Sequence, residues 1–239
     1  MSPTPQVKRL QPVDVSAQTT KTRILDAAEE LFMEHGFEAT SLRLITTAAG
    51  VNLAAANYHF GSKEELFQAV LTRRLDPMNR QRMDLLESFE AAAGGHTLSC
   101  DKILSAMFIP ALKLARDKET GGQNFLRLLG RAYADPAPFI RDFLSQQYHE
   151  MIARFRTAFA KALPHLPKDE LSWRLHFVMG ALSYTLAGSD VLKMIAQYQP
   201  DEADNDELLL SRLAPFLAAG LMAPATTSGS VHQMFQEAG

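Results

Sequence analysis

Two short helices are predicted only a few residues apart, in a segment of the chain that contains no acidic residue. The 25 residues from Ala39 to Lys63 lack Asp and Glu, although the whole chain has a formal net charge of -3. Within this segment, Thr40–Ile45 predicts one helix, Leu53–His59 predicts a second, and Ala49–Asn52 forms the turn between them. Such a helix-turn-helix can place its second helix in the major groove of DNA. We therefore expect the chain to bind double-stranded DNA.

The net negative charge does not argue against this partner, because it averages over parts of the chain that never meet DNA. Local charge is the relevant quantity, and the acid-free segment carries Arg43, His59 and Lys63. Since these cations are few, we expect the affinity for DNA of arbitrary sequence to be modest.

Length and composition are those of a globular protein of the cytoplasm. The 239 residues suffice for one large domain or two small ones. No apolar run has the length of a membrane span. The N-terminal residues lack a charged stretch followed by an apolar one, so we do not expect secretion. The single cysteine, Cys100, excludes an internal disulfide and a cysteine-based zinc finger. We interpret Cys100 as a small buried or capping residue and expect no contact with membranes.

The chain between its polar ends is predicted to be helical throughout, because no segment alternates like a strand. We therefore expect an all-α fold. Residues 1–18 are predicted to form a flexible arm, 19–67 the helix-turn-helix head, 68–223 a larger helical body, and 224–239 a flexible tail. Helices are expected at about 20–35, 63–75, 78–93, 101–116, 123–133, 135–163, 167–188 and 206–222.

Local signals at the helix ends support this division. Gly36 is placed to end the first helix in a left-handed conformation. Asn52 is a good N-cap for the second helix of the helix-turn-helix. Ser62 and Glu65 have the spacing of a capping box, which begins the next helix. Pro77 is expected to end or kink that helix.

The pattern of the helix-turn-helix also predicts which side faces DNA. An apolar side would hold the two helices together, and it is formed by Ile45, Ala49, Val51, Ala56 and Phe60. This packing turns Ala54, Asn57 and Tyr58 outward. Because Leu53 and Ala54 offer no hydrogen bonds to bases, direct reading of sequence would depend on Arg43, Asn57 and apolar contact with thymine methyl groups. The alternative for Asn57 is that it only caps or solvates its helix.

Phosphate contacts are expected on both sides of this reading helix. Thr40 and Ser41 place hydroxyls and backbone N–H groups at a helix start, which favours an anion. His59 and Lys63 can each hold a further phosphate.

The head resembles a known family. The matching residues are Gly36-Phe37, Thr40-Ser41, Ala49-Gly50-Val51-Asn52 and the run from Tyr58 to Phe67, which agree in order and spacing with the N-terminal pattern of TetR-type transcriptional regulators. This resemblance implies an all-α homodimer with a three-helix DNA-binding head and a larger C-terminal domain for effector binding and dimerisation.

By position, the resemblance implies roles for single residues. Arg43 corresponds to a residue that reads guanine, and Tyr58, His59 and Lys63 correspond to phosphate contacts. Asn57 departs from the pattern, because Tyr is usual there. The predicted DNA-binding set is Thr40, Ser41, Arg43, Asn52, Leu53, Ala54, Asn57, Tyr58, His59 and Lys63.

The body contains a segment, Asp101–Arg116, that is apolar nearly all round and is therefore buried on every side or lines a cavity. Later helices are rich in Met and Phe, which adapt to flexible apolar ligands, although such stripes are more often plain core. Phe125–Tyr133 followed by Asp135-Pro136 resembles PsrA-type repressors, a TetR subgroup. That resemblance implies a response to a long-chain fatty acid or its CoA ester.

The ligand site implied by this second resemblance needs a cation or polar group for the carboxylate end. Arg127, Arg131 and His176 are candidates, and the alternative is that each arginine pairs with an acid such as Asp135 or Asp142. The predicted ligand-binding set is Met107, Phe108, Phe125, Arg127, Arg131, Met151, Phe155, Trp173, His176 and Phe177.

Two helices of the body are predicted to form a dimer interface. Both 173–188 and 208–222 are apolar round most of their circumference, and small residues allow close approach of helices. Two such helices per chain give a four-helix interface, and a palindromic operator requires a two-fold partner. The predicted interface set is Trp173, Gly180, Ala181, Tyr184, Ala187, Leu209, Leu213, Phe216 and Leu217.

The function expected from these features is a dimeric repressor that binds a palindromic operator and is released by a small apolar effector. An alternative is a TetR-type regulator of efflux or catabolism genes that responds to a different hydrophobic ligand. An all-α lipid-handling enzyme is a remoter alternative, since the histidines are scattered and no glycine-rich phosphate loop is present. A helical adaptor that binds protein is a third class.

We expect no catalytic residues, no metal and no cofactor other than the effector.

Overall fold

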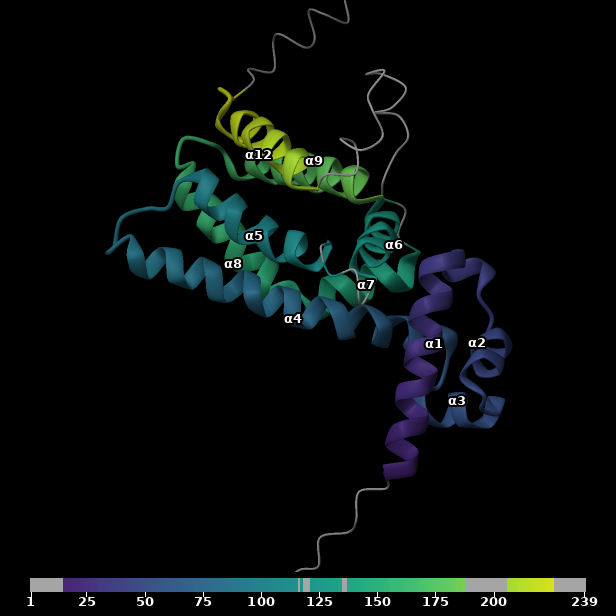
Figure 1. Cartoon of the computed structure of the whole chain (residues 1–239). Helices are drawn as coiled ribbons and strands as arrows, with labels where there is room; N and C mark the ends of the chain where they lie inside the picture. Colours follow the sequence, from purple (N-terminus) through teal and green to yellow (C-terminus); the bar gives the residue numbers. More distant parts are fainter. Residues whose placement is uncertain (1–14, 116, 118–120, 135–136, 188–205, 226–239) are drawn as a thin grey trace, which may run out of the picture. The chain divides into compact units, whose positions relative to one another are not determined.

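Helices make up all the regular structure that is described. The computed structural model describes residues 15–115, 117, 121–134, 137–187 and 206–225, and within them every regular element is an α-helix (Figure 1). This confirms the predicted all-α class. Residues 1–14 of the predicted arm and 226–239 of the predicted tail lie outside the described residues. None of the helices in the described part of the chain is long and apolar enough to cross a membrane.

The helices fall into two compact units, divided by their contacts after Val70. The head comprises residues up to 70 and the body those from 71 onward, whereas the sequence places this boundary after Phe67. The helices of the head are α1 (Val15–Ala39), α2 (Leu42–Ala49) and α3 (Leu53–Phe60), and α4 (Lys63–Ala92) begins in the head and continues into the body. The body further contains α5 (Cys100–Ala115), α6 (Gly122–Ala134), α7 (Pro138–Gln147), α8 (His149–Ala162), α9 (Lys168–Ala187) and α12 (Asp206–Met222).

The head packs α1, α2 and α3 against one another and against the first turns of α4. Phe32 and Phe67 are fully buried and meet edge to face with ring centroids 4.9 Å apart, and Phe37 completes the cluster at 5.1 Å from Phe67. Aromatic pairs in this arrangement stabilise a small core beyond the area that they bury. The remaining core of the head is Ile24, Ala27, Ala28, Ile45, Ala49, Ala56, Phe60, Leu66 and Val70.

The predicted N-cap at Asn52 and the predicted capping box of Ser62 and Glu65 are confirmed. The Asn52 side chain accepts a hydrogen bond from the Ala55 N–H at 2.8 Å. In the capping box, the Glu65 N–H donates to the Ser62 hydroxyl at 3.0 Å, and the Ser62 N–H donates to the Glu65 carboxylate at 2.9 Å. Gly36 has a positive φ of 80°, but its ψ of 174° differs from the predicted left-handed cap, and α1 continues beyond this kink to Ala39.

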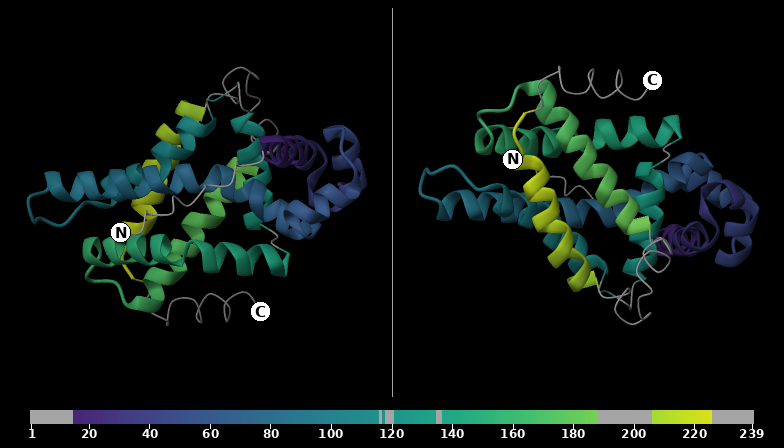
Figure 2. Two further views of the ribbon diagram at one scale, coloured as in Figure 1. Left: turned by 90° about the horizontal axis from the view of Figure 1, so that it is seen from below. Right: turned by 90° about the horizontal axis from the view of Figure 1, so that it is seen from above.

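Residues of α4, α5, α8, α9 and α12 form an apolar core of the body. Figure 2 shows the body's helices in two further views. α6 lies along α9, and α5 lies along α12. Arg174 ties α9 to α12, because its buried guanidinium donates to the Leu221 carbonyl at 2.8 Å and to the Glu170 carboxylate at 2.8 Å. It also donates to the carbonyls of Ala223 and Pro224, so one arginine caps the C-terminal end of α12.

Two helices of the body differ from the sequence prediction. One long helix is expected from about 135 to 163, but the structure divides it into α7 and α8 at Tyr148, which has φ -115° and ψ 16°. The Tyr148 ring is buried and its hydroxyl donates to Asp76 of α4 at 3.0 Å, a distant contact that the local pattern cannot reveal. Conversely, α4 continues through Pro77 to Ala92.

Candidate functional site

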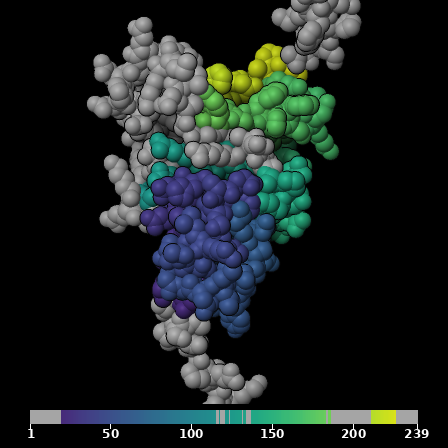
Figure 3. All heavy atoms as spheres, turned by 90° about the vertical axis from the view of Figure 1, so that its right-hand side faces the viewer, coloured from purple at the N-terminus to yellow at the C-terminus, as the bar shows by residue number. Residues whose placement is uncertain are grey.

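The outer face of α3 is the part of the head that is best placed to meet a partner. Ala54, Asn57 and Tyr58 are exposed, and 84% of Tyr58 is accessible to solvent. Ala56 and Phe60 lie on the opposite face and are buried. This is the orientation expected from the sequence. Figure 3 shows the surface of the head in purple and blue.

The same exposed surface includes the start of α2. Ser41 caps this helix, because its hydroxyl accepts a hydrogen bond from the Leu44 N–H at 3.2 Å. Arg43 is exposed, and its guanidinium has no hydrogen-bond or ion-pair partner among the described residues. The first backbone N–H groups of a helix lack partners within the helix. An exposed arginine and free N–H groups therefore lie together at one helix start, as an anionic ligand requires.

Thr40 does not have the exposed hydroxyl that the sequence predicts. It is 1% exposed, and its hydroxyl donates to the Gly36 carbonyl at 2.8 Å and to the Leu31 carbonyl at 3.2 Å. These two hydrogen bonds hold the Thr40 side chain inside the head. Thr40 therefore fixes the connection from α1 to α2 and presents no hydroxyl to a phosphate.

Lys63 and His59 lie beside the exposed face but are half-buried. The Lys63 ammonium donates to the Phe37 carbonyl at 3.0 Å and lies over the Phe37 ring, 4.1 Å from its centroid. An ammonium has three donors, so Lys63 keeps donors for an anion while its position is fixed. The His59 ring meets Tyr58 edge to face at 5.1 Å.

Arg23 of α1 is a positioning residue of the head that sequence reasoning missed. Its guanidinium donates to the Gly50 carbonyl at 3.0 Å and to the Ala49 carbonyl, at the C-terminal end of α2. A cation at this end also interacts favourably with the helix dipole. Gly50 has a φ of 62°, and a Cβ there would lie 2.7 Å from the Arg23 guanidinium. The turn thus needs both a glycine and the arginine that faces it.

The body contains a partly enclosed cavity of about 320 Å³ between α4, α5, α6, α7, α8 and α9. Its wall is mainly apolar and includes Met107, Leu129, Met151, Phe155, Phe159 and Val178. Among the described residues, the polar side chains of the wall are Asn79, Arg82, Tyr133, Tyr148, Arg156 and Ser172, with neither Asp nor Glu among them. A concave apolar site with a few polar groups is typical of small-molecule binding.

Arg82 of α4 is the buried cation of this cavity, with 7% of the residue exposed. Its Nε donates to the Met107 carbonyl at 2.9 Å, and its Nη1 donates to the Asn79 side-chain oxygen at 2.9 Å. No carboxylate in the described part of the chain pairs with it. Burial lowers the pKa of Arg82, and the nearby Tyr133 opposes this effect. Burial also disfavours the charged form of Tyr133 and therefore raises the pKa of its hydroxyl.

The cavity contains some of the side chains expected from the sequence and leaves others out. Met107, Met151 and Phe155 line it. The predicted cations do not: Arg127 is exposed outside the wall, and the side chain of Arg131 lies outside the described residues. The predicted members Phe108, Phe125, Trp173, His176 and Phe177 also lie outside the wall, the first two in the core and the other three on the exposed face of α9.

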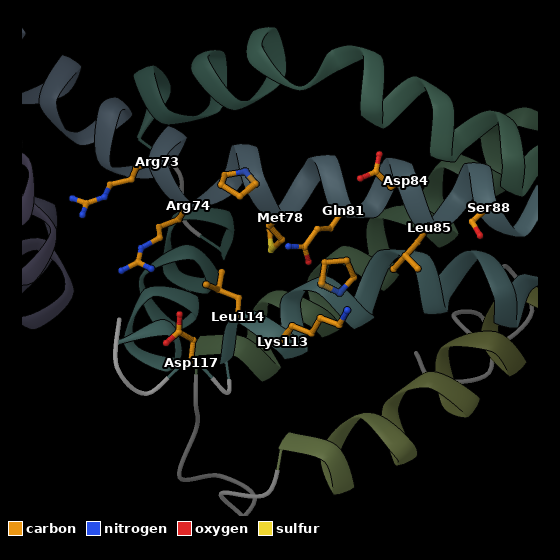
Figure 4. A pocket seen from close by; sticks show the side chains of 12 residues that line it. Arg73, Arg74, Met78, Gln81, Asp84, Leu85, Ser88, Lys113, Leu114 and Asp117 are labelled. Carbon is orange, nitrogen blue, oxygen red and sulfur yellow. The ribbon is translucent and has the colours of Figure 1, made fainter.

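A second concavity of the body is an open groove of about 630 Å³ along α4 and α5. Figure 4 shows Arg73 and Arg74 at one end of it and Ser88 at the other, with Lys113 reaching in from α5. Its charged residues are of both signs, since Asp84 and Asp117 also line it. This groove lacks the apolar enclosure of the cavity.

An exposed apolar stripe runs along α9 and continues on α12. Trp173, Phe177 and Tyr184 of α9 are 60%, 63% and 54% exposed, and Phe216 of α12 is 70% exposed. Gly180 is exposed between them, whereas Leu217 is buried within its own chain. Ala181 and Leu213 are half-buried, and the side chains of Ala187 and Leu209 lie outside the described residues. Large aromatic side chains exposed in a row mark a surface that contacts a partner.

Both units match family models. Residues 24–70 match the model described as bacterial regulatory proteins of the tetR family, and residues 105–220 match the model of the tetracyclin repressor-like C-terminal domain. The first match covers the helix-turn-helix, and the second covers most of the helices around the cavity.

Two similar proteins are HTH-type transcriptional regulators. The HTH-type transcriptional regulator UidR of Escherichia coli is 41% identical over 59 residues, which are 25% of this chain and 30% of that protein. TtgR of Pseudomonas putida, also an HTH-type transcriptional regulator, is 44% identical over 55 residues, which are 23% of this chain and 26% of that protein. The chain therefore matches less than a third of the length of these relatives.

Solved structures extend the similarity of fold to nearly the whole chain. Salmonella enterica GusR has a TM-score of 0.55 at 20% identity, covering 90% of this chain and 100% of that one. Mycobacterium smegmatis AmtR has a TM-score of 0.53 at 18% identity, covering 92% of each chain.

Proposed function

The chain belongs to the TetR family of bacterial transcriptional regulators, and from this premise we propose that it is a dimeric, ligand-responsive repressor. It binds a palindromic operator through α2 and α3 of each head and releases it when a small apolar effector enters the body. Members of this family bind DNA operators, are typically dimeric and respond to small molecules without a cofactor. The proposed activity is that of a regulator in the cytoplasm rather than of an enzyme.

The observation that carries this proposal is the exposed face of the head. Arg43 and Asn57 are exposed on the two helices, and the segment that forms them contains no carboxylate to repel phosphate. Arg43 can donate two hydrogen bonds to guanine, and Asn57 can pair with adenine. Ser41, Asn52 and Tyr58 are exposed beside them, together with Leu53, and we assign these residues to phosphate and thymine-methyl contacts.

Dimerisation is supported by the aromatic stripe on α9 and α12. Burial of Trp173, Phe177, Tyr184 and Phe216 against the same residues of a second chain would form a self-complementary interface about a two-fold axis. A two-fold protein reads two half-sites of a palindrome. The exposed Gly180 allows the α9 helices to approach closely at the centre of this interface.

The response to an effector is supported by the cavity and by the continuity of α4. Arg82 and Asn79 belong both to the cavity wall and to α4, which begins at Lys63 in the head. A ligand that binds differently to two positions of α4 shifts the balance between them. We propose that the bound state no longer matches the operator spacing. The apolar wall is compatible with a long-chain fatty acid or acyl-CoA.

The proposal is tested by selecting operators from random duplexes with the full-length chain. We expect a palindrome with two half-sites, and an affinity that falls steeply as salt rises, because phosphate contacts release counterions. Selection of no consensus sequence, or an affinity that does not depend on salt, would contradict the proposed function.

A further inference from the structure

The cavity of the body contains a buried cation whose charge is not balanced by any described residue. Among the described residues, Arg82 makes two hydrogen bonds, both to neutral oxygens, and the described part of the cavity wall contains no Asp or Glu. We propose that the cavity binds a small amphiphile with a single carboxylate, which pairs with the Arg82 guanidinium while its apolar tail lies along the wall. This inference rests on the proposed function only in taking this cavity as the effector site.

The geometry of Arg82 leaves room for such a partner. A guanidinium has five N–H donors in a planar fork, and this fork matches a carboxylate with two parallel bonds. The contacts to Met107 and Asn79 engage Nε and Nη1, which orients the plane of the group. Nη2 has no hydrogen-bond partner among the described residues. The guanidinium is therefore held in one position with donors still available.

Burial explains why an anion would bind strongly here. A cation that is 93% removed from solvent has lost most of its hydration, since only 7% of the residue is exposed. Hydrogen bonds to the neutral oxygens of Met107 and Asn79 offset part of the lost hydration free energy, and an ion pair with an anion would offset far more. Tyr133 also lines the cavity close enough to Arg82 to interact with its charge, so its hydroxyl can donate to the same carboxylate.

The remainder of the wall limits the charge and shape of the ligand. Within the described residues of the wall, the other cation is Arg156, which is exposed, while the surfaces between are formed by Met, Leu, Val and Phe. A ligand with several phosphates would leave most of its charge without a partner. A CoA thioester also lacks the free carboxylate that Arg82 would meet. The wall therefore favours the free acid over its CoA ester.

The open groove of Figure 4 is a poorer site for the same ligand. Arg73, Arg74 and Lys113 line it, but so do Asp84 and Asp117, and its volume opens to solvent. Charges that face water and carry opposite signs nearby attract a single carboxylate only weakly.

The test is calorimetric titration of the full-length protein with matched amphiphiles below their micelle concentrations and without DNA. The probes are decanoate, decanol and decyltrimethylammonium, which have the same tail and a negative, neutral or positive head. We expect decanoate to bind at least tenfold more tightly than decanol, and decyltrimethylammonium to bind most weakly. Octanoate and dodecanoate would show whether affinity rises with the length of the tail. This comparison needs no variant, so it does not depend on a mutant folding.

Two variants then locate the carboxylate. Arg82→Met removes the charge with little change in length, and Arg127→Met removes an exposed arginine of α6 outside the cavity. We expect the first to lose the preference for decanoate over decanol and the second to keep it. Thermal unfolding of each variant by circular dichroism verifies that the fold is retained.

Several results would overturn the inference. They are equal binding of decanoate and decanol, failure of all three probes to bind, or a preference for decanoate that survives in Arg82→Met. None of these affects the binding of operator DNA, which is measured separately. Conversely, a protein that selects no operator yet binds decanoate through Arg82 would refute the proposed function and leave the ligand assignment intact.

Discussion

At the scale of single residues, the head separates side chains that hold its helices from side chains that face solvent. Arg23 and Thr40 bond to backbone carbonyls of their own chain. Arg43, Asn57 and Tyr58 are exposed on α2 and α3. Substitutions in the two groups should therefore have different consequences: the first should lower stability, and the second should lower DNA binding at unchanged stability.

Arg23→Met tests the first group. The variant loses the hydrogen bonds to the Ala49 and Gly50 carbonyls and the favourable interaction with the dipole of α2. Because Arg23 is exposed, we expect a loss of only about 1 kcal/mol in the free energy of unfolding, measured with urea. Arg43→Met is the matched control, and an equal loss of stability in that variant would contradict the distinction.

Arg43→Met also tests the reading of DNA. Loss of a bidentate contact with guanine should reduce the affinity for the selected operator by about 1–3 kcal/mol, with a smaller effect on random duplexes. Fluorescence anisotropy with both duplexes at one salt concentration measures the two affinities. Equal losses on operator and random DNA would assign Arg43 to a phosphate instead of a base.

The lone thiol gives a prediction about burial. Cys100 is 4% exposed, and burial raises its pKa, with the neighbouring Asp101 acting in the same direction. The reactive thiolate is therefore scarce and shielded at neutral pH. We expect Cys100 to react slowly with a thiol reagent in the folded protein and rapidly in urea. Rapid labelling without denaturant would show that the start of α5 opens readily.

Short-range features of the sequence were predictable, and contacts between distant residues were not. The cap at Asn52 and the capping box of Ser62 and Glu65 depend on residues three apart, so the pattern identifies them. Arg23 reaches Gly50, and Arg82 reaches Met107, only after the chain has folded. For this reason the sequence analysis looked for the ligand cation on an apolar helix, whereas we propose Arg82 of α4 in that role.

At the scale of helices, one buried arginine adds hydrogen bonds to the apolar contacts that pair α9 with α12. Arg174 bonds to Glu170 within α9 and to carbonyls at the end of α12. Helix ends that are buried need such donors. The break at Tyr148 has a similar origin, because its hydroxyl bonds to Asp76 of α4. Both features depend on contacts between helices, which helical periodicity does not encode.

Arg174→Met should therefore weaken the body. Several carbonyls at the end of α12 lose their donor, and Glu170 loses its ion-pair partner. We expect a loss of roughly 1.5–3 kcal/mol in the free energy of unfolding, measured by urea denaturation followed by circular dichroism. Arg127→Met removes an exposed arginine of α6 and should leave the unfolding midpoint unchanged. Similar midpoints for both variants would contradict the role assigned to Arg174.

At the scale of the whole molecule, the proposed function requires two chains. The aromatic stripe on α9 and α12 remains exposed in a single chain, and a palindromic operator demands a two-fold reader. Phe177→Asp should separate the dimer, because it places a charge in the centre of the proposed interface while the monomer keeps its core. Sedimentation velocity measures the change, and Ala160→Asp on the exposed face of α8 is the control. A variant that stays dimeric would place the interface elsewhere.

Trp173 offers a second readout of the same interface, because it is the one tryptophan in the sequence and is 60% exposed in a single chain. Its emission should shift to shorter wavelength as the protein concentration rises and dimers form. Emission that does not change with concentration in a protein that dimerises over that range would contradict the burial of Trp173 at the interface.

A single titration can test whether ligand binding in the body releases DNA from the head. The retention of the selected operator duplex is measured at fixed salt as carboxylates and acyl-CoAs of increasing tail length are added. We expect the free acids to release DNA from the wild-type protein and from Arg127→Met, but not from Arg82→Met. If none of these ligands weakens operator binding, the proposed response to a carboxylate is wrong, even if the palindrome itself is bound tightly.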